Sequence, residues 1–178
     1  MIVTAKLRSI SLAIFVILGV FAMSRSAAAE VIDRVLAVVA GQLITLSDVN
    51  AARDLGLQSA EGAADPVRAI LSKLIDRELI VAEVERYAPP EPTAEAIDRE
   101  SGRIRMRFPT AEAFVAALER SGADEKQLRE IVRQDLRIRA YLDQRFASAQ
   151  ERRQAVMDDW LSGLRRRGDV VDLYLSGR

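Results

Sequence analysis

Segments with the pattern of β-strands occur only at residues 31–45 and 170–175, near the two ends of the chain that would remain after removal of the first 29 residues, and this feature limits the fold most. Residues 31–39 read V-I-D-R-V-L-A-V-V, and an apolar run at 43–45 follows Ala40-Gly41. This pattern predicts a short hairpin. The run V-V-D-L-Y-L at 170–175 predicts one more strand. Because a lone strand needs a partner for its backbone groups, we expect both ends to meet in one small antiparallel sheet.

Helix start signals recur between these two ends. Side chains of Ser, Thr and Asp can accept from the free backbone N–H groups of a first helical turn. The predicted starts are at Ser47, at Asp65-Pro66, at Thr93, at Thr110, at Asp124 and at a capping box in Ser148-Ala149-Gln150-Glu151. The predicted fold class is therefore mainly α, with about six helices packed around the small sheet.

The first residues have the pattern of a secretory signal peptide. Lys6 and Arg8 precede an apolar run over 10–23, and three alanines end the segment at 27–29. The run of 14 residues is shorter than the roughly 20 needed to cross a bilayer. We therefore predict a signal peptide over 1–29 that is cleaved before Glu30, in preference to an uncleaved membrane anchor. Residues 30–178 then form a single domain.

The composition excludes several chemistries. The chain contains no His and no Cys, so it has no disulfide, no thiolate nucleophile, no Cys or His zinc ligand and no Ser-His-Asp triad. We therefore expect no enzyme activity, no catalytic residue, no metal and no cofactor. After removal of residues 1–29, 23 basic residues face 26 acidic ones, which argues against a nucleic-acid partner.

Three motifs in this order resemble the SurA family of periplasmic chaperones. They are D-R-V-L-A-V-V-A-G-Q-L-I-T-L-S-D-V over 33–49, L-I-D-R-E-L-I over 74–80 and W-L-S-G-L-R-R-R-G-D-V-V-D-L-Y-L over 160–175. The first two look like the N-terminal domain of that family, and the third looks like its C-terminal helix and strand. Two features depart from the family pattern. Ala40 stands where relatives often have Asn, and the parvulin-type prolyl isomerase domains are missing between Phe146 and the final helix.

The resemblance implies an ATP-independent holdase in the periplasm. Its partners would be unfolded polypeptide clients, including outer-membrane protein precursors, and the protein would be a monomer that does not stay in the membrane after signal cleavage. The candidate client-binding residues are Met106, Phe108 and Phe114, although all three could instead be ordinary core residues. Two other readings stay open: an envelope adaptor that binds one folded partner, and, as the weakest, an enzyme related to the peptidyl-prolyl isomerases.

Overall fold

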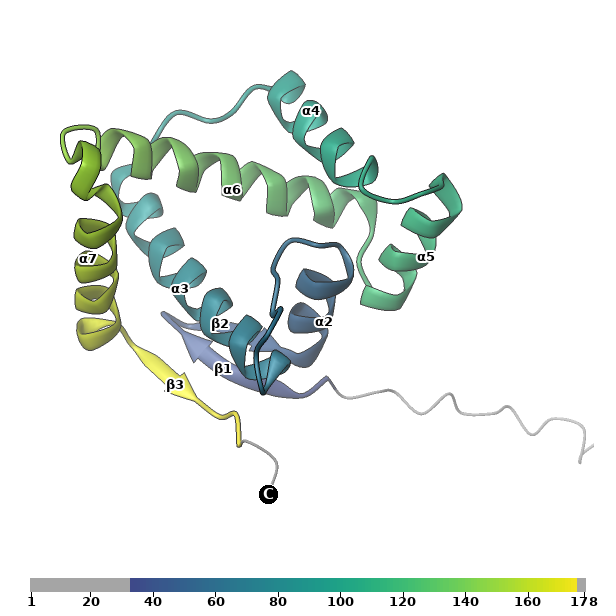
Figure 1. The fold of residues 1–178 in the computed structure, drawn as a ribbon, viewed down its shortest axis with the longest axis horizontal. Coiled ribbons are helices and arrows are strands. Elements are labelled where there is room, and N and C mark those ends of the chain that lie inside the picture. Colours follow the sequence, from purple (N-terminus) through teal and green to yellow (C-terminus); the bar gives the residue numbers. More distant parts are fainter. Residues whose placement is uncertain (1–32, 176–178) are drawn as a thin grey trace, which may run out of the picture. The chain divides into compact units, whose positions relative to one another are not determined.

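The computed structural model describes residues 33–175, so the predicted signal peptide over 1–29 and the first residues of the predicted hairpin lie outside the described residues. Within this part the fold is mainly helical with a small antiparallel sheet, as predicted (Figure 1). The elements in chain order are β1 (Val35–Val39), β2 (Gln42–Thr45), α2 (Leu46–Asp54), α3 (Pro66–Tyr87), α4 (Ala94–Arg105), α5 (Ala111–Ser121), α6 (Glu125–Arg145), a 3₁₀ turn (Gln150–Arg152), α7 (Arg153–Arg167) and β3 (Val170–Asp172).

The N-terminal hairpin turns over two residues, Ala40 and Gly41. Both have positive φ, at 49° and 83°, as a two-residue turn between twisted strands requires. Glycine adopts this conformation easily, whereas alanine does so rarely. The Ala40 N–H donates to the Asp169 carbonyl at 2.8 Å, so the turn is held by the segment that leads into β3.

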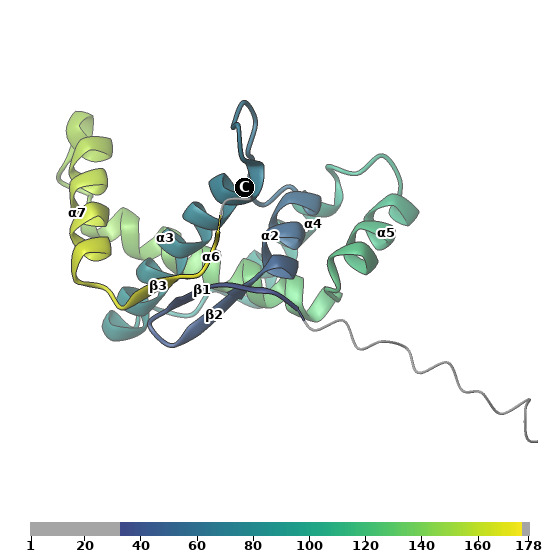
Figure 2. The ribbon, with the colours of Figure 1, turned by 90° about the horizontal axis from the view of Figure 1, so that it is seen from below.

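The two ends of the described chain meet in one sheet, which confirms the prediction. The strand order is β2-β1-β3, and β1 pairs antiparallel with both neighbours (Figure 2). The final strand is shorter than the predicted run over 170–175 and ends at Asp172. The physical reason is local, because the Asp172 carboxylate accepts from the Tyr174 N–H at 3.0 Å and bends the chain out of the strand.

Tyr174 then fastens the C-terminal segment to the start of α3. Its hydroxyl donates to the Asp65 carboxylate at 2.9 Å, and the Arg68 N–H donates to the same group at 2.9 Å. The Arg68 N–H, followed by the Tyr174 hydroxyl, holds the pKa of the Asp65 carboxyl below its ordinary value. The hydrogen bond to Asp65, followed by desolvation, raises the pKa of the Tyr174 phenol. The helix cap and the end of the chain therefore share one carboxylate.

Four of the predicted helix caps form as the sequence indicates. Asp65, Thr93, Thr110 and Asp124 each accept from a backbone N–H in the first turn of the following helix. These caps depend only on residues within one turn of each other, which is why the sequence reveals them.

Two predicted caps are wrong. The cap of α2 is Thr45 instead of Ser47, because Thr45 and Asp48 form the reciprocal capping box two residues earlier. The predicted box at Ser148 does not start α7. The chain instead makes two tight turns after Phe146, with the Ala149 N–H bonded to the Phe146 carbonyl, and α7 begins at Arg153 without a side-chain cap.

Most of the buried apolar side chains belong to two clusters. The first lies between the sheet and helices α2, α3 and α7, and its buried members are Leu36, Ala37, Val39, Ile44, Val49, Ala52, Ile70, Leu71, Ile75, Leu79 and Leu164. The second joins the end of α2 to α4, α5 and α6, and its buried members are Leu55, Ile104, Phe114, Ala117, Leu118, Leu128 and Val132. Leu57, just after α2, packs against both clusters. The loop after α2 thus connects the two cores.

Candidate functional site

A groove lies where β2, α2, α3 and α6 approach one another. Its first hollow has a volume of about 280 Å³ and is lined from all four elements. A second hollow of about 390 Å³ lies along α3 and α6 and shares Gln58, Arg77 and Asp135 with the first. The two hollows therefore adjoin each other at Arg77, and together they make up the groove.

The base of the groove is apolar. The apolar residues that line the first hollow are Leu43, Ile44, Ala51, Ala52, Leu57, Leu74 and Ile131. The second hollow adds Ile80, Ile138 and Leu142. The side chain of Leu43 is 61 % exposed but lies on the opposite face of the sheet from that of Ile44, so the apolar surface of the hollow comes from the other residues. Such a surface gains free energy when an apolar side chain covers it, by roughly 25 cal/mol for each Å² removed from water.

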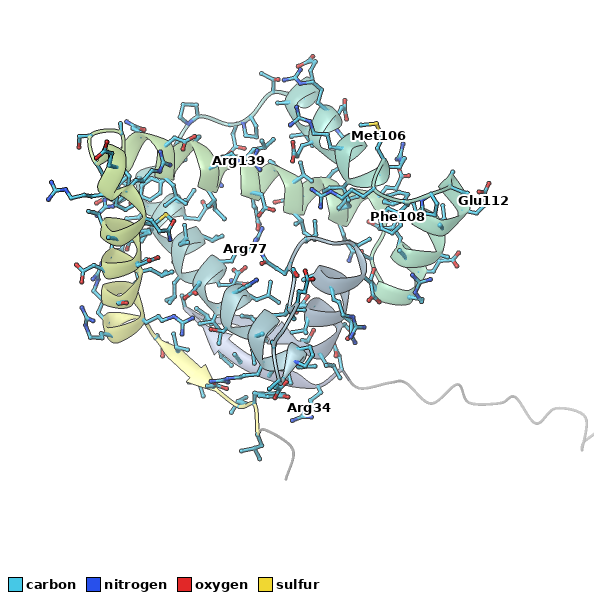
Figure 3. The ribbon with its side chains drawn as sticks, viewed as in Figure 1. Arg34, Arg77, Met106, Phe108, Glu112 and Arg139 are labelled. Atoms are coloured by element: carbon cyan, nitrogen blue, oxygen red, sulfur yellow. The ribbon has the colours of Figure 1, made fainter. Side chains whose placement is uncertain are left out.

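Arg77 crosses the groove from α3 and is fully engaged by its neighbours. Its guanidinium donates to Asp135 at 3.0 Å and to Gln134 at 3.0 Å on α6, and to Glu78 at 2.8 Å on its own helix. Figure 3 shows Arg77 in the space between α3 and α6. These bonds link α3 to α6 at the point where the two hollows meet.

The polar groups on the walls suit a peptide backbone. Gln42 and Gln58 line the first hollow, and each side-chain amide can both donate and accept hydrogen bonds. A peptide backbone presents the same groups at every residue, whatever its side chains. The combination of an apolar base and amide-bearing walls can therefore hold an extended chain without selecting one sequence.

The three residues that the sequence singled out do not share a site. Phe114 is only 1 % exposed and packs edge-on against Phe108 with their ring centroids 5.5 Å apart. Phe108 is half-buried against the second core cluster, whereas Met106 is 77 % exposed. Phe114 is thus a core residue, whereas Met106 is exposed and Phe108 is partly exposed.

Met106 and Phe108 also lie away from the groove. They belong to the connection between α4 and α5, and Figure 3 shows both well separated from Arg77. The sequence shows that these apolar side chains lie near the end of a sparsely apolar helix. It does not show which of them are covered by neighbouring helices. Met106 is exposed, and its role in binding clients stays a prediction.

The groove itself was missed by the sequence analysis. One signal for it was available, because L-I-D-R-E-L-I over 74–80 places Arg77 inside a helix that is apolar on nearly every side. A charged side chain at such a position usually has a partner on a neighbouring element. The sequence does not say that the partners are Gln134 and Asp135, almost sixty positions later.

Comparison with models of known protein families gives no match for this chain, and comparison with curated proteins gives none either. The described residues contain no group of His, Cys, Asp or Glu side chains placed to hold a metal ion. No helix within residues 33–175 combines the length and the apolar character that a membrane crossing needs.

Proposed function

We propose that this protein is an ATP-independent chaperone that holds unfolded polypeptide segments in the groove between β2, α3 and α6. The observation that carries the proposal is the groove itself. It has an apolar base and amide-bearing walls, and Arg77 links α3 to α6 across it. The three motifs that resemble the SurA family support the same function. The clients proposed on that basis are unfolded precursors of outer-membrane proteins in the periplasm.

Several features favour binding over catalysis. The whole chain lacks His and Cys, which are the side chains used most often as general bases and as thiolate nucleophiles. The acidic groups of the first hollow are engaged by Arg77 and by the cap of α2, and Asp76 in the second hollow accepts from Arg165. We therefore propose a holdase without prolyl isomerase activity, and an isomerisation rate above background would contradict that part of the proposal.

The test is the suppression of light scattering by several unrelated unfolded proteins. We expect the wild-type protein to delay the aggregation of all of them without ATP. The variant Ala51→Arg puts a long charged side chain into the first hollow and should lose most of this effect. Ala140→Arg makes the same change at an exposed position of α6 outside the groove, and it should act like the wild-type protein.

An envelope adaptor is the second candidate, and one observation favours it. Leu43, Val38 and Val171 are paired across the three strands, so they lie in one row on the same face of the sheet. Leu43 and Val171 are 61 % and 48 % exposed. A flat apolar row of this kind suits a folded partner. Capture of one folded protein at a one-to-one ratio, with no effect on aggregation, would support the adaptor and reject the chaperone.

The proposed location has a separate test. Expression with the complete N-terminal sequence, followed by fractionation, should yield the protein in the periplasm with Glu30 as its first residue. A protein that keeps Met1 and stays with the membrane fraction would contradict the cleaved signal peptide.

A further inference from the structure

β2 is an edge strand, and its free side runs along the groove. The strand order β2-β1-β3 leaves β2 with a partner on one side only, and Gln42, Leu43 and Ile44 line the first hollow. Backbone N–H and C=O groups on a free edge can pair with another extended chain. The question is which of these groups point away from β1.

The register of the hairpin answers this question. Val39 and Gln42 flank the two-residue turn and pair with each other, so they exchange both backbone hydrogen bonds. Ala37 and Ile44 form the next such pair. Leu43 lies between Gln42 and Ile44, and its N–H and C=O therefore point away from β1.

The hydrogen bonds on the other side of β1 give the same alternation. The Ala40 N–H donates to Asp169, and the Leu36 carbonyl accepts from the Leu173 N–H at 2.9 Å. Even-numbered residues of β1 thus turn their backbone groups toward β3, and odd-numbered residues turn theirs toward β2. This agreement fixes Leu43 as the residue with a free donor and a free acceptor.

The free edge is short. The Thr45 N–H, which also points away from β1, donates to the Asp48 carboxylate at 2.8 Å. The helix that starts at Leu46 then ends the strand. An incoming strand can therefore form backbone hydrogen bonds with β2 at only one residue, Leu43.

The charges beside this edge favour a basic segment. Asp48, Glu78 and Asp135 line the first hollow together with a single cation, Arg77. Arg77 contacts two of these carboxylates, and the hollow is left with an excess of negative charge. Lys and Arg side chains near it would gain attraction, whereas Asp and Glu side chains would be repelled.

We propose that the groove binds an extended basic segment of an unfolded chain by adding it as a strand to β2, with backbone hydrogen bonds to Leu43. This inference rests on the proposed function and names the kind of segment that the groove selects. Apolar side chains of the added strand would cover the base of the groove, and basic side chains would lie near Glu78 and Asp48.

Two synthetic peptides test the proposal. Both have ten residues of alternating valine and threonine, and two threonines are replaced by lysine in one and by glutamate in the other. We expect the lysine peptide to bind about tenfold more tightly at low salt, and the difference to shrink as ionic strength rises. Glu78→Gln should reduce the preference. Equal binding of the two peptides would overturn the charge selection.

The strand addition has its own readouts. Leu43→Pro removes the free N–H at an edge position where proline is tolerated, whereas Leu43→Ala keeps it. We expect Leu43→Pro to bind the lysine peptide about threefold to tenfold more weakly than Leu43→Ala does. In the wild-type protein, saturating peptide should slow hydrogen exchange of the Leu43 amide about tenfold or more. Unchanged exchange would overturn the strand addition even if Leu43→Pro proves unstable.

The aggregation assay separates this inference from the proposed function. A protein that suppresses aggregation but prefers neither peptide and leaves the Leu43 amide unprotected is a chaperone without strand addition. A protein that does not suppress aggregation fails the proposed function itself.

Discussion

Replacing Gly168 with alanine tests how closely the turn between α7 and β3 packs against α3. Gly168 lies between α7 and β3, and its N–H donates to the Leu164 carbonyl at 2.7 Å. A Cβ atom at this position would lie 2.5 Å from Leu79 Cδ2 and 2.8 Å from the Leu164 oxygen. The leucine side chain is buried and the oxygen belongs to the backbone, so neither has free space to move into.

The expected effect follows from these two distances. Carbon atoms in contact prefer a separation of about 3.5–4.0 Å, so the new methyl group overlaps Leu79 by about 1 Å. Extra volume in a packed core destabilises by about 1–3 kcal/mol. With a urea dependence of about 1–3 kcal/mol per molar, we expect the unfolding midpoint to fall by about 1 M.

Urea unfolding followed by circular dichroism measures this change. Gly102→Ala is the matched control, because Gly102 lies inside α4 and nothing would lie within 4 Å of its added Cβ. That variant should gain about 0.5–1 kcal/mol from the better helix propensity of alanine. A Gly168→Ala protein as stable as the wild type would refute the close packing of the end of α7 against α3 at this point.

Three further outcomes are expected. Phe114→Ala should lower the free energy of unfolding by about 3–5 kcal/mol, whereas Met106→Ala should change it by less than about 0.5 kcal/mol; similar values from urea unfolding would contradict their different burial. Thr45→Ala should lose about 1 kcal/mol in the same assay because α2 loses its cap, and an unchanged midpoint would argue against that cap. Tyr174→Phe should destabilise most near neutral pH. The pKa of Asp65 is lowered and that of Tyr174 is raised, so the difference in free energy of unfolding between the variant and the wild type should shrink below about pH 4 and above about pH 10. A difference that does not change with pH would refute the hydrogen bond between the two side chains.

The helix boundaries show how far local sequence signals reach. The starts of α3, α4, α5 and α6 were predicted because each cap uses a side chain and a backbone N–H within the same turn. The start of α7 was predicted wrongly, because Ser148 lies within the tight turns that follow Phe146 and not at the beginning of a helix. A capping motif predicts a helix only where the chain around it is free to begin one.

The candidate site could be predicted only in small part. Met106 is exposed and Phe114 is buried, although both follow the same kind of apolar pattern in the sequence. Helical periodicity indicates which face of a helix is apolar, but it does not identify the element that covers that face. The burial of each side chain depends on how α4 packs against α6 and how α5 packs against α2.

The sequence by itself determined the mainly helical class, the small sheet and the meeting of the two ends, because caps act over single turns and an unpaired strand requires a partner. Only the tertiary structure decided where the groove lies. Leu43, Arg77 and Asp135 are far apart along the chain and line one hollow only after β2, α3 and α6 have packed. Contacts of this kind leave no local pattern, because each depends on the relative position of elements that the sequence specifies one at a time.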